Sequence, residues 1–111
     1  IYYFEAAPHR GLTGAPEAVD AFGSFVTYSS AAGEIDTNAL VRTGDIALVP
    51  FGFHGPAAAP PEYDLYYLNV MAGPERGWLI TDDPAQAWLR QTWAAQQPDP
   101  RLPYRSEGEP R

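Results

Sequence analysis

At 111 residues the chain is long enough for one domain with a core of modest size. Hydrophobic residues make up 45% and aromatic residues 14% of it, which is typical of a folded protein. It has no cysteine, which excludes disulfides and thiolate metal sites and fits a reducing cytoplasm. A formal charge of −7 excludes the basic surface that nucleic acids require. The longest uncharged run, residues 46–61, is broken by prolines, so we expect no membrane-spanning helix.

Strand signals separated by turn signals fill the first 80 residues. Residues 1–6 are rich in strand formers and are followed by Pro8. Further strands are expected at residues 22–29, 38–42, 46–50, 55–59, 63–71 and 77–80. The run 46–50 is almost continuously apolar, which is typical of a strand buried on both faces. Short strands at this spacing predict an all-β antiparallel sandwich or closed barrel.

One helix is predicted after the strands, over residues 84–95. Asp83 is a natural N-cap and Pro84 a natural first helical residue. Trp88 and Trp93 fall near one face, which we expect to pack against the outside of the strands. The expected organisation is one domain over residues 1–97, followed by a polar, proline-rich tail over residues 98–111.

The segment 44–54 carries the main chemical signal. Gly44 permits a tight turn, and Gly52 bends the backbone with no side chain in the way. This bend can aim the imidazole of His54 into the mouth of a barrel, where a neutral ring nitrogen binds a divalent metal. By itself, however, a histidine after such a bend is more often a surface or hydrogen-bonded residue. His9, in a loop, is expected to be a surface histidine.

The spacing G-x5-P-x-G-x-H in this segment resembles the second conserved motif of the cupin superfamily. That motif has one more residue before the histidine and an asparagine four positions after it, where this chain has Ala58. Longer stretches carry a more specific resemblance, namely PFGFH at 50–54, PEYDLYYLNVMAGP at 61–74, Trp78, DDP at 82–84 and Trp88. Through them the chain resembles the 5-deoxy-glucuronate isomerase family, the two-cupin sugar isomerases of inositol breakdown, from Ile1 to about Pro103.

The resemblance implies a cupin-type antiparallel β-barrel (jelly roll), incomplete at its N-terminus, with one C-terminal helix. It also implies the aldose–ketose isomerisation of 5-deoxy-glucuronate to 5-dehydro-2-deoxy-gluconate. Members of the family bind a divalent metal, zinc or manganese, through two histidines, a glutamate and a later histidine. Only the last of these matches this chain, at His54, since the others would precede Ile1. We therefore expect this chain alone to hold metal weakly or not at all, and to be inactive.

A sugar acid is the substrate that the resemblance implies, and three further residues are candidates to bind it. Tyr67 and Asn69 share one strand face and can hydrogen-bond sugar hydroxyls, although Tyr67 is equally well explained as a core aromatic residue. Arg76 can pair with the substrate carboxylate or remain a solvated turn residue. The scattered carboxylates give no spaced acid–base pair, so the catalytic base is not identified.

Two other functions remain open. The chain can be a non-catalytic cupin remnant that binds a sugar or builds an oligomer, or another cupin enzyme such as an iron-dependent oxygenase, which requires a histidine–carboxylate metal site. A cupin without its upstream strands exposes a sheet edge and part of its apolar interior. We therefore expect a homo-oligomer.

Overall fold

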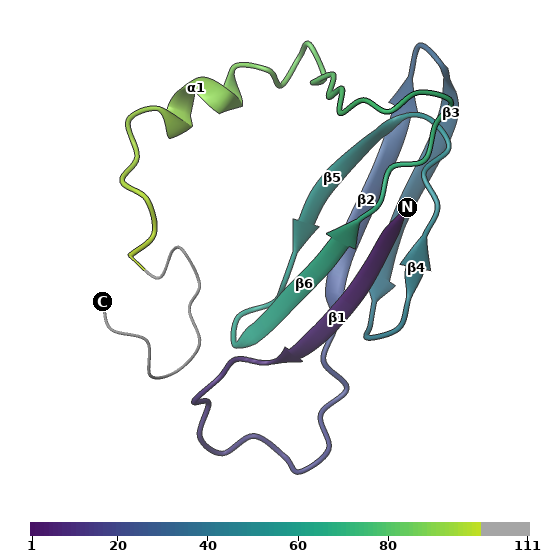
Figure 1. Cartoon of the computed structure of the whole chain (residues 1–111). Coiled ribbons are helices and arrows are strands. Elements are labelled where there is room, and N and C mark those ends of the chain that lie inside the picture. The colour runs from purple at the N-terminus through teal and green to yellow at the C-terminus, as the bar shows by residue number, and fades with distance from the viewer. Residues whose placement is uncertain (101–111) are drawn as a thin grey trace. The chain divides into compact units, whose positions relative to one another are not determined.

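The computed structural model describes residues 1–100 of the chain, which divides into two compact units, Ile1–Ile80 and Thr81–Arg111. Within the described residues the first unit contains six strands and the second contains one short helix, α1 (Leu89–Trp93) (Figure 1). The strands are β1 (Tyr2–Pro8), β2 (Gly23–Ser30), β3 (Gly33–Val41), β4 (Ile46–Ala47), β5 (Phe53–Ala58) and β6 (Tyr63–Asn69).

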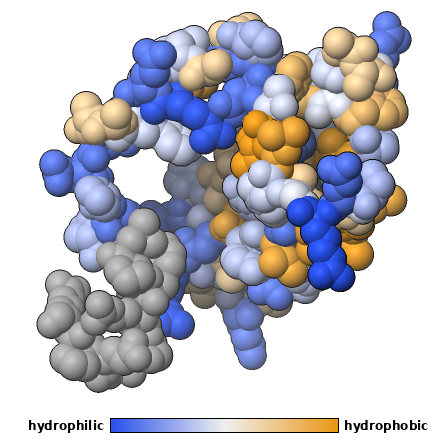
Figure 2. Space-filling model, turned by 45° about the horizontal axis from the view of Figure 1, so that its top comes forward, coloured by the Kyte–Doolittle hydropathy of each residue, from blue (hydrophilic) through white to orange (hydrophobic). Residues whose placement is uncertain are grey.

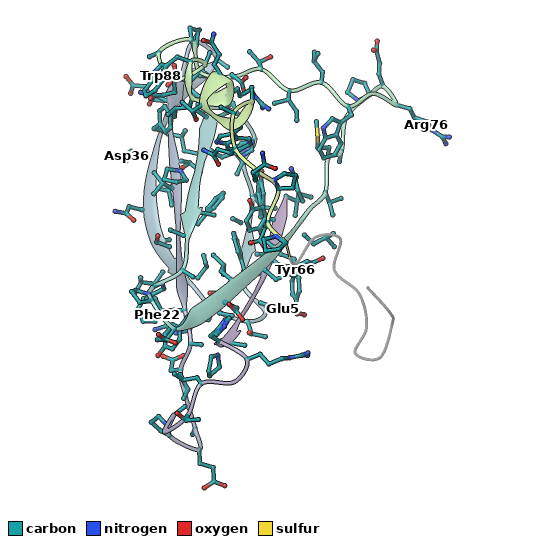
Figure 3. All side chains as sticks on the ribbon, turned by 90° about the vertical axis from the view of Figure 1, so that its left-hand side faces the viewer. Glu5, Phe22, Asp36, Tyr66, Arg76 and Trp88 are labelled. Carbon is teal, nitrogen blue, oxygen red and sulfur yellow. The ribbon has the colours of Figure 1, made fainter. Side chains whose placement is uncertain are left out.

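The strands form two antiparallel sheets of three strands each (Figure 1). Sheet A has the order β4-β1-β6 and sheet B the order β3-β2-β5. Along the main ladder of sheet A, β1 pairs with β6 from Tyr2 opposite Asn69 to Pro8 opposite Tyr63. In sheet B, the central strand β2 pairs with β3 on one side and β5 on the other. Figure 3 views the two sheets nearly edge-on, with one side of each turned toward the other.

Alternating side chains of the two central strands build the core between the sheets. Tyr2 and Phe4 of β1 are buried, and so is Phe25 of β2, while Glu5 lies on the side of sheet A away from sheet B (Figure 3). The rings of Phe4 and Phe25 meet edge to face with their centroids 5.2 Å apart, a favourable geometry for aromatic pairs. Val41 completes the buried cluster. Both central strands therefore bury every second side chain over much of their length, as expected for strands with one face on the core.

The closed barrel expected from the sequence is not formed. No ladder joins sheet A to sheet B among the described strands, so the architecture is two facing antiparallel sheets. Sheet A is short along β4, which contributes only the pairs of Tyr2 with Ala47 and Tyr3 with Ile46. Beyond them backbone bonds continue into the turn, because Phe4 donates to the carbonyl of Asp45 and accepts from the amide of Gly44, at 3.0 Å each. Further along β1, the Thr43 hydroxyl donates to the carbonyl of Ala6 at 3.0 Å and accepts from its amide at 2.9 Å.

The prediction that residues 46–50 are buried on both faces is wrong. Ile46 and Leu48 are 64% and 70% exposed, whereas Ala47 and Val49 between them pack partly against the core. The run therefore covers the core with one face only, and within the first unit no strand pairs or packs over its other face. Pro50, which has no backbone N–H to donate, follows this short strand.

Two other strand predictions need correction. The strand expected at residues 38–42 begins earlier, at Gly33, and forms a hairpin with β2 through Ala31 and Ala32. At the bulge in this hairpin the Ser29 hydroxyl bonds both the amide and the carbonyl of Ile35, at 3.1 Å each, which holds the polar start of β3 in place. No strand forms at residues 77–80.

The predicted helix is shorter than residues 84–95. Asp83 caps the turn as expected, with its carboxylate accepting from the amide of Ala85 at 2.9 Å. The backbone bonds that follow join residues three apart, as from Leu89 to Gln86 and from Arg90 to Ala87, which is the pattern of tighter, less regular turns. Only Leu89–Trp93 is α-helical, and no residue of α1 is buried.

Hydrophobic side chains also gather on the outer side of sheet A. Tyr3 of β1 lies opposite both Ile46 and Leu68, so these three residues form a row across the sheet. Ile46 and Leu68 are exposed, as is Val70 near the same end. Figure 2 views the molecule from above the side shown in Figure 1 and shows orange, hydrophobic groups at the surface over the strands. No helix in residues 1–100 has the length and apolarity to span a membrane.

Candidate functional site

The strand pairing brings two of the candidate residues to the inner side of sheet A. Tyr67 lies opposite Phe4 and Asn69 opposite Tyr2 in the ladder between β1 and β6. Since directly paired residues point to the same face, Tyr67 and Asn69 face sheet B as Tyr2 and Phe4 do. The rings of Tyr2 and Tyr67 meet edge to face, with their centroids 5.6 Å apart. Tyr67 remains 47% exposed, so this side of the sheet is open around it.

His54 reaches the same space from sheet B. It lies on β5 opposite Thr27 of β2, whose side chain is buried on the inner face. The next pair along this ladder is Phe25 with Ala57, so β5 has one residue more than β2 between the two pairs, which is a β-bulge. Gly52 precedes the strand with a φ of 92°, and a Cβ there would lie 2.8 Å from the carbonyl oxygen of Tyr28. The bend before His54 therefore needs glycine.

Tyr2 and His54 join the two sheets through their side chains. The Tyr2 hydroxyl oxygen lies 2.8 Å from Nδ1 of His54, and the two rings are edge to face at 5.1 Å. Because Tyr2 also contacts Tyr67, the three side chains form one cluster, which we call the Tyr2–His54–Tyr67 cluster. Asn69 is the cross-strand neighbour of Tyr2 at its edge.

Burial shifts the pKa values of two residues of the cluster, His54 and Tyr2. Partial burial of the imidazole lowers the pKa of His54, and the ammonium group of Ile1 lowers it further. His54 is therefore neutral at neutral pH. Burial also raises the pKa of Tyr2, and the nearby Tyr67 hydroxyl adds to that effect, so Tyr2 keeps its proton. The site is an uncharged hydrogen-bonded pair.

Thr27 adds a polar group that the sequence did not suggest. It is 2% exposed, and its hydroxyl has no hydrogen-bond partner within the described residues. Such groups are uncommon in folded proteins because an unpaired buried hydroxyl costs about 1–3 kcal/mol. Tyr2 was missed as well, although its place next to Phe4 in an alternating strand was a usable signal, since a tyrosine on an apolar face needs a partner.

Arg76 does not join this cluster. It borders a separate surface hollow of about 530 Å³, with Glu75 and Trp78 among its neighbours. A smaller hollow of about 260 Å³ lies beside the loop at residues 12–19, and none of the candidate residues lines it. His9 is a surface residue hydrogen-bonded to Asp64, with 3.0 Å between Nδ1 and the carboxylate.

The described residues do not make a complete metal site. No group of three or more histidine or carboxylate side chains within residues 1–100 is placed to hold an ion. His54 is the one imidazole of the cluster, and its Nδ1 is already hydrogen-bonded. A resident divalent metal in proteins normally has three or four protein ligands, so this donor set does not fit one by itself.

Comparison with known proteins shows which family the chain belongs to. The profile of the KduI/IolB family matches residues 1–89. The chain belongs to the KduI/IolB family. Its relatives include the 5-deoxy-glucuronate isomerase of Lacticaseibacillus casei, 37% identical over 89 residues that cover 80% of this chain and 28% of the relative. The 5-deoxy-glucuronate isomerase of Geobacillus thermodenitrificans is 50% identical over 58 residues, which cover 52% of this chain and 21% of that protein.

This member of the KduI/IolB family thus matches less than a third of the length of those isomerases. The match includes every residue of the Tyr2–His54–Tyr67 cluster and Asn69, Thr27 and Arg76, because all of them lie within residues 1–89. No solved structure shows a significant match to the chain.

Proposed function

We propose that this chain is part of a cytoplasmic 5-deoxy-glucuronate isomerase with a cupin jelly-roll fold, acting on a sugar acid. The observation that carries the proposal is the family match over residues 1–89, since the matched relatives bear that name. The reaction is the aldose–ketose isomerisation of 5-deoxy-glucuronate to 5-dehydro-2-deoxy-gluconate. Its central step moves hydrogen between neighbouring carbons, either as a proton through an enediol or as a hydride. The proton route needs a general base, and the cluster offers none that is assigned.

In this proposal the inner side of the sheets binds the sugar acid. Tyr67 is half exposed and shares its face with Asn69, so its hydroxyl and the Asn69 amide are available to bond sugar hydroxyls. Arg76 is the proposed partner of the carboxylate, because guanidinium groups bind carboxylates with two parallel hydrogen bonds. It lies on the segment that directly follows β6, the strand that carries the other two residues.

A divalent metal, zinc or manganese, is proposed for the whole enzyme, with His54 as one of its ligands. Such an ion polarises carbonyl and hydroxyl oxygens of a bound sugar. The chain described here supplies one imidazole, and a single ligand holds a metal far more weakly than the usual three or four. We therefore propose that this chain alone is inactive.

A second candidate function is a non-catalytic module that binds a sugar or mediates association. The observation that favours it is the lack of a group of three metal-ligating side chains in residues 1–100. The row of Tyr3, Ile46 and Leu68 on the outer side of sheet A, in which Ile46 and Leu68 are exposed, is the proposed contact surface of a homo-oligomer.

A graft distinguishes the two functions. Residues 1–89 of this chain replace the matching segment of the Lacticaseibacillus casei isomerase, and turnover of 5-deoxy-glucuronate is measured with zinc or manganese present. The isomerase proposal expects an active graft, which His54→Ala inactivates. The isolated chain, assayed in parallel, should show no turnover.

Tyr67→Phe and Tyr66→Phe provide a matched pair within the graft. The two residues are adjacent on β6, but Tyr66 lies opposite Glu5 on the outer side, whereas Tyr67 faces the cluster. Tyr67→Phe should raise KM at least about tenfold, because loss of one hydrogen bond worth ~1.4 kcal/mol corresponds to a tenfold weaker binding. Tyr66→Phe should leave KM unchanged. A folded but inactive graft would favour the non-catalytic module.

A further inference from the structure

The strongest unused observation is the direction of the hydrogen bond between Tyr2 and His54. Either group can donate, since a neutral imidazole carries its proton on Nδ1 or on Nε2 and a phenol both donates and accepts. We infer that Tyr2 is a positioning residue that donates its proton to Nδ1 of His54 and thereby fixes the neutral imidazole with its proton on Nε2. This inference rests on the contact itself and does not depend on the proposed function.

The donor count decides the direction. Tyr2 is 6% exposed, and within the described residues His54 is the one hydrogen-bond partner of its hydroxyl. If His54 donated from Nδ1, the phenolic proton would have no acceptor among the described residues, at a contact that is partly buried. If Tyr2 donates, every proton of the pair is used or solvated, because the His54 residue is itself exposed. Buried donors without acceptors are the costlier defect, so the second arrangement is preferred.

The consequence is that neither ring nitrogen of His54 has a free lone pair. Nδ1 accepts from Tyr2, and Nε2 carries the ring proton. In this chain the imidazole is therefore a hydrogen-bond donor through Nε2. Metal binding at His54 requires the Tyr2 hydrogen bond to reverse or break, which would leave the Tyr2 proton without its acceptor. In this chain by itself, the pair thus disfavours a metal at the one imidazole of the cluster, and in the whole enzyme a metal at His54 would have to reverse or break this hydrogen bond.

His9 provides the opposite case in the same molecule. Its Nδ1 lies 3.0 Å from the carboxylate of Asp64, and an ionised carboxylate can only accept. His9 must therefore donate from Nδ1, which leaves its proton on Nδ1 and the lone pair on Nε2. The chain has two histidines, and the two are expected in opposite tautomers.

Two-bond ¹H–¹⁵N correlation spectra of the uniformly ¹⁵N-labelled chain test this directly. They are recorded about 1.5 pH units above the ordinary histidine pKa of about 6.5. His9→Gln assigns the two patterns. We expect the Nε2-protonated pattern for His54 and the Nδ1-protonated pattern for His9. An Nδ1-protonated pattern for His54 in the unaltered chain would overturn the inference without any variant.

Variants then test whether Tyr2 is the cause. Tyr2→Phe should convert His54 to a mixture of tautomers and leave His9 unchanged, and Asp64→Asn should do the reverse. Tyr66→Phe, on the outer side of the sheet, should change neither pattern. A folded Tyr2→Phe chain with an unaltered His54 pattern would refute the positioning role. If that variant does not fold, the spectrum of the unaltered chain still decides the tautomer.

Discussion

Phe4 and Glu5 are consecutive residues of β1, yet Phe4 is fully buried between the two sheets and Glu5 is exposed on the other side. Phe4 contacts Tyr2 and Phe25 in the core, whereas Glu5 accepts a hydrogen bond from the Tyr3 hydroxyl at 3.2 Å. The central strand of sheet A therefore has one face that stabilises the fold and one face that tolerates change.

The first prediction follows from this difference. Phe4→Ala should lower the free energy of unfolding by about 3–5 kcal/mol, because it removes a buried ring and leaves a cavity. Glu5→Ala should change it by less than about 0.5 kcal/mol, as is usual for surface positions. Urea unfolding followed by far-UV circular dichroism measures both. Equal losses in the two variants would contradict the assignment of the core to the inner face of β1.

Gly52 gives the second prediction. Its φ of 92° is unfavourable for any residue with a Cβ, and an added methyl group would contact Ile35 and the Tyr28 carbonyl. Gly52→Ala should therefore destabilise the chain by about 1–3 kcal/mol. Gly73→Ala is the control, since nothing lies within 4 Å of a Cβ at that position. Thermal unfolding of the two variants would reject the prediction if their midpoints were the same.

The ion pair between Asp82 and Arg90 gives the third prediction. Arg90 hydrogen-bonds the carboxylate and lowers the pKa of Asp82 below its ordinary value of 3.8. The stabilisation is therefore complete above the ordinary pKa and is lost as the pH falls through the lowered one. Arg90→Gln should return the pKa of Asp82 toward 3.8. Carboxyl ¹³C shifts recorded over acidic pH measure this, and an unchanged titration midpoint would show that the pair does not form in solution.

Self-association through the outer side of sheet A is the fourth prediction. Leu68→Asp places a charge in the row formed with Tyr3 and Ile46, so it should weaken association at least about tenfold, or ~1.4 kcal/mol. Asp36→Asn should leave association unchanged, because Asp36 lies on the outer side of sheet B (Figure 3). Sedimentation velocity at micromolar concentration measures the association. A chain that is monomeric before any substitution would exclude the proposed contact.

Patterns within one strand were predictable from the sequence, whereas relations between strands were only partly so. The alternation in residues 63–71 correctly placed Tyr67 and Asn69 on one face, because side chains in any extended strand alternate. The direction in which that face points depends on β1, whose residues are at least 55 positions away in the chain from those of β6 with which they pair. The prediction that residues 46–50 are buried on both faces was wrong for the same reason. Burial of the second face requires another element to pack against it, and the run itself does not specify one.

The nearest neighbours of His54 were the least predictable part of the site. The glycine bend correctly indicated a special position, but Tyr2 lies 52 residues away in sequence and Thr27 belongs to another strand. Nothing in a linear pattern specifies which tyrosine a histidine will meet across two facing sheets. Only the register of the ladders, together with the bulge in β5, brings these groups together.

Because of that bulge, the face from which His54 projects depends on the number of residues in β5 as well as on their types. In a regular strand anchored at the pair of Phe25 with Ala57, Gly55 would lie opposite Thr27 and His54 would project from the outside of sheet B. A slip of one residue would thus exchange an imidazole for a hydrogen atom at the inner face while every amino acid stayed the same. During divergence, the number of residues between His54 and Ala57 is therefore as informative about a retained site as the histidine itself.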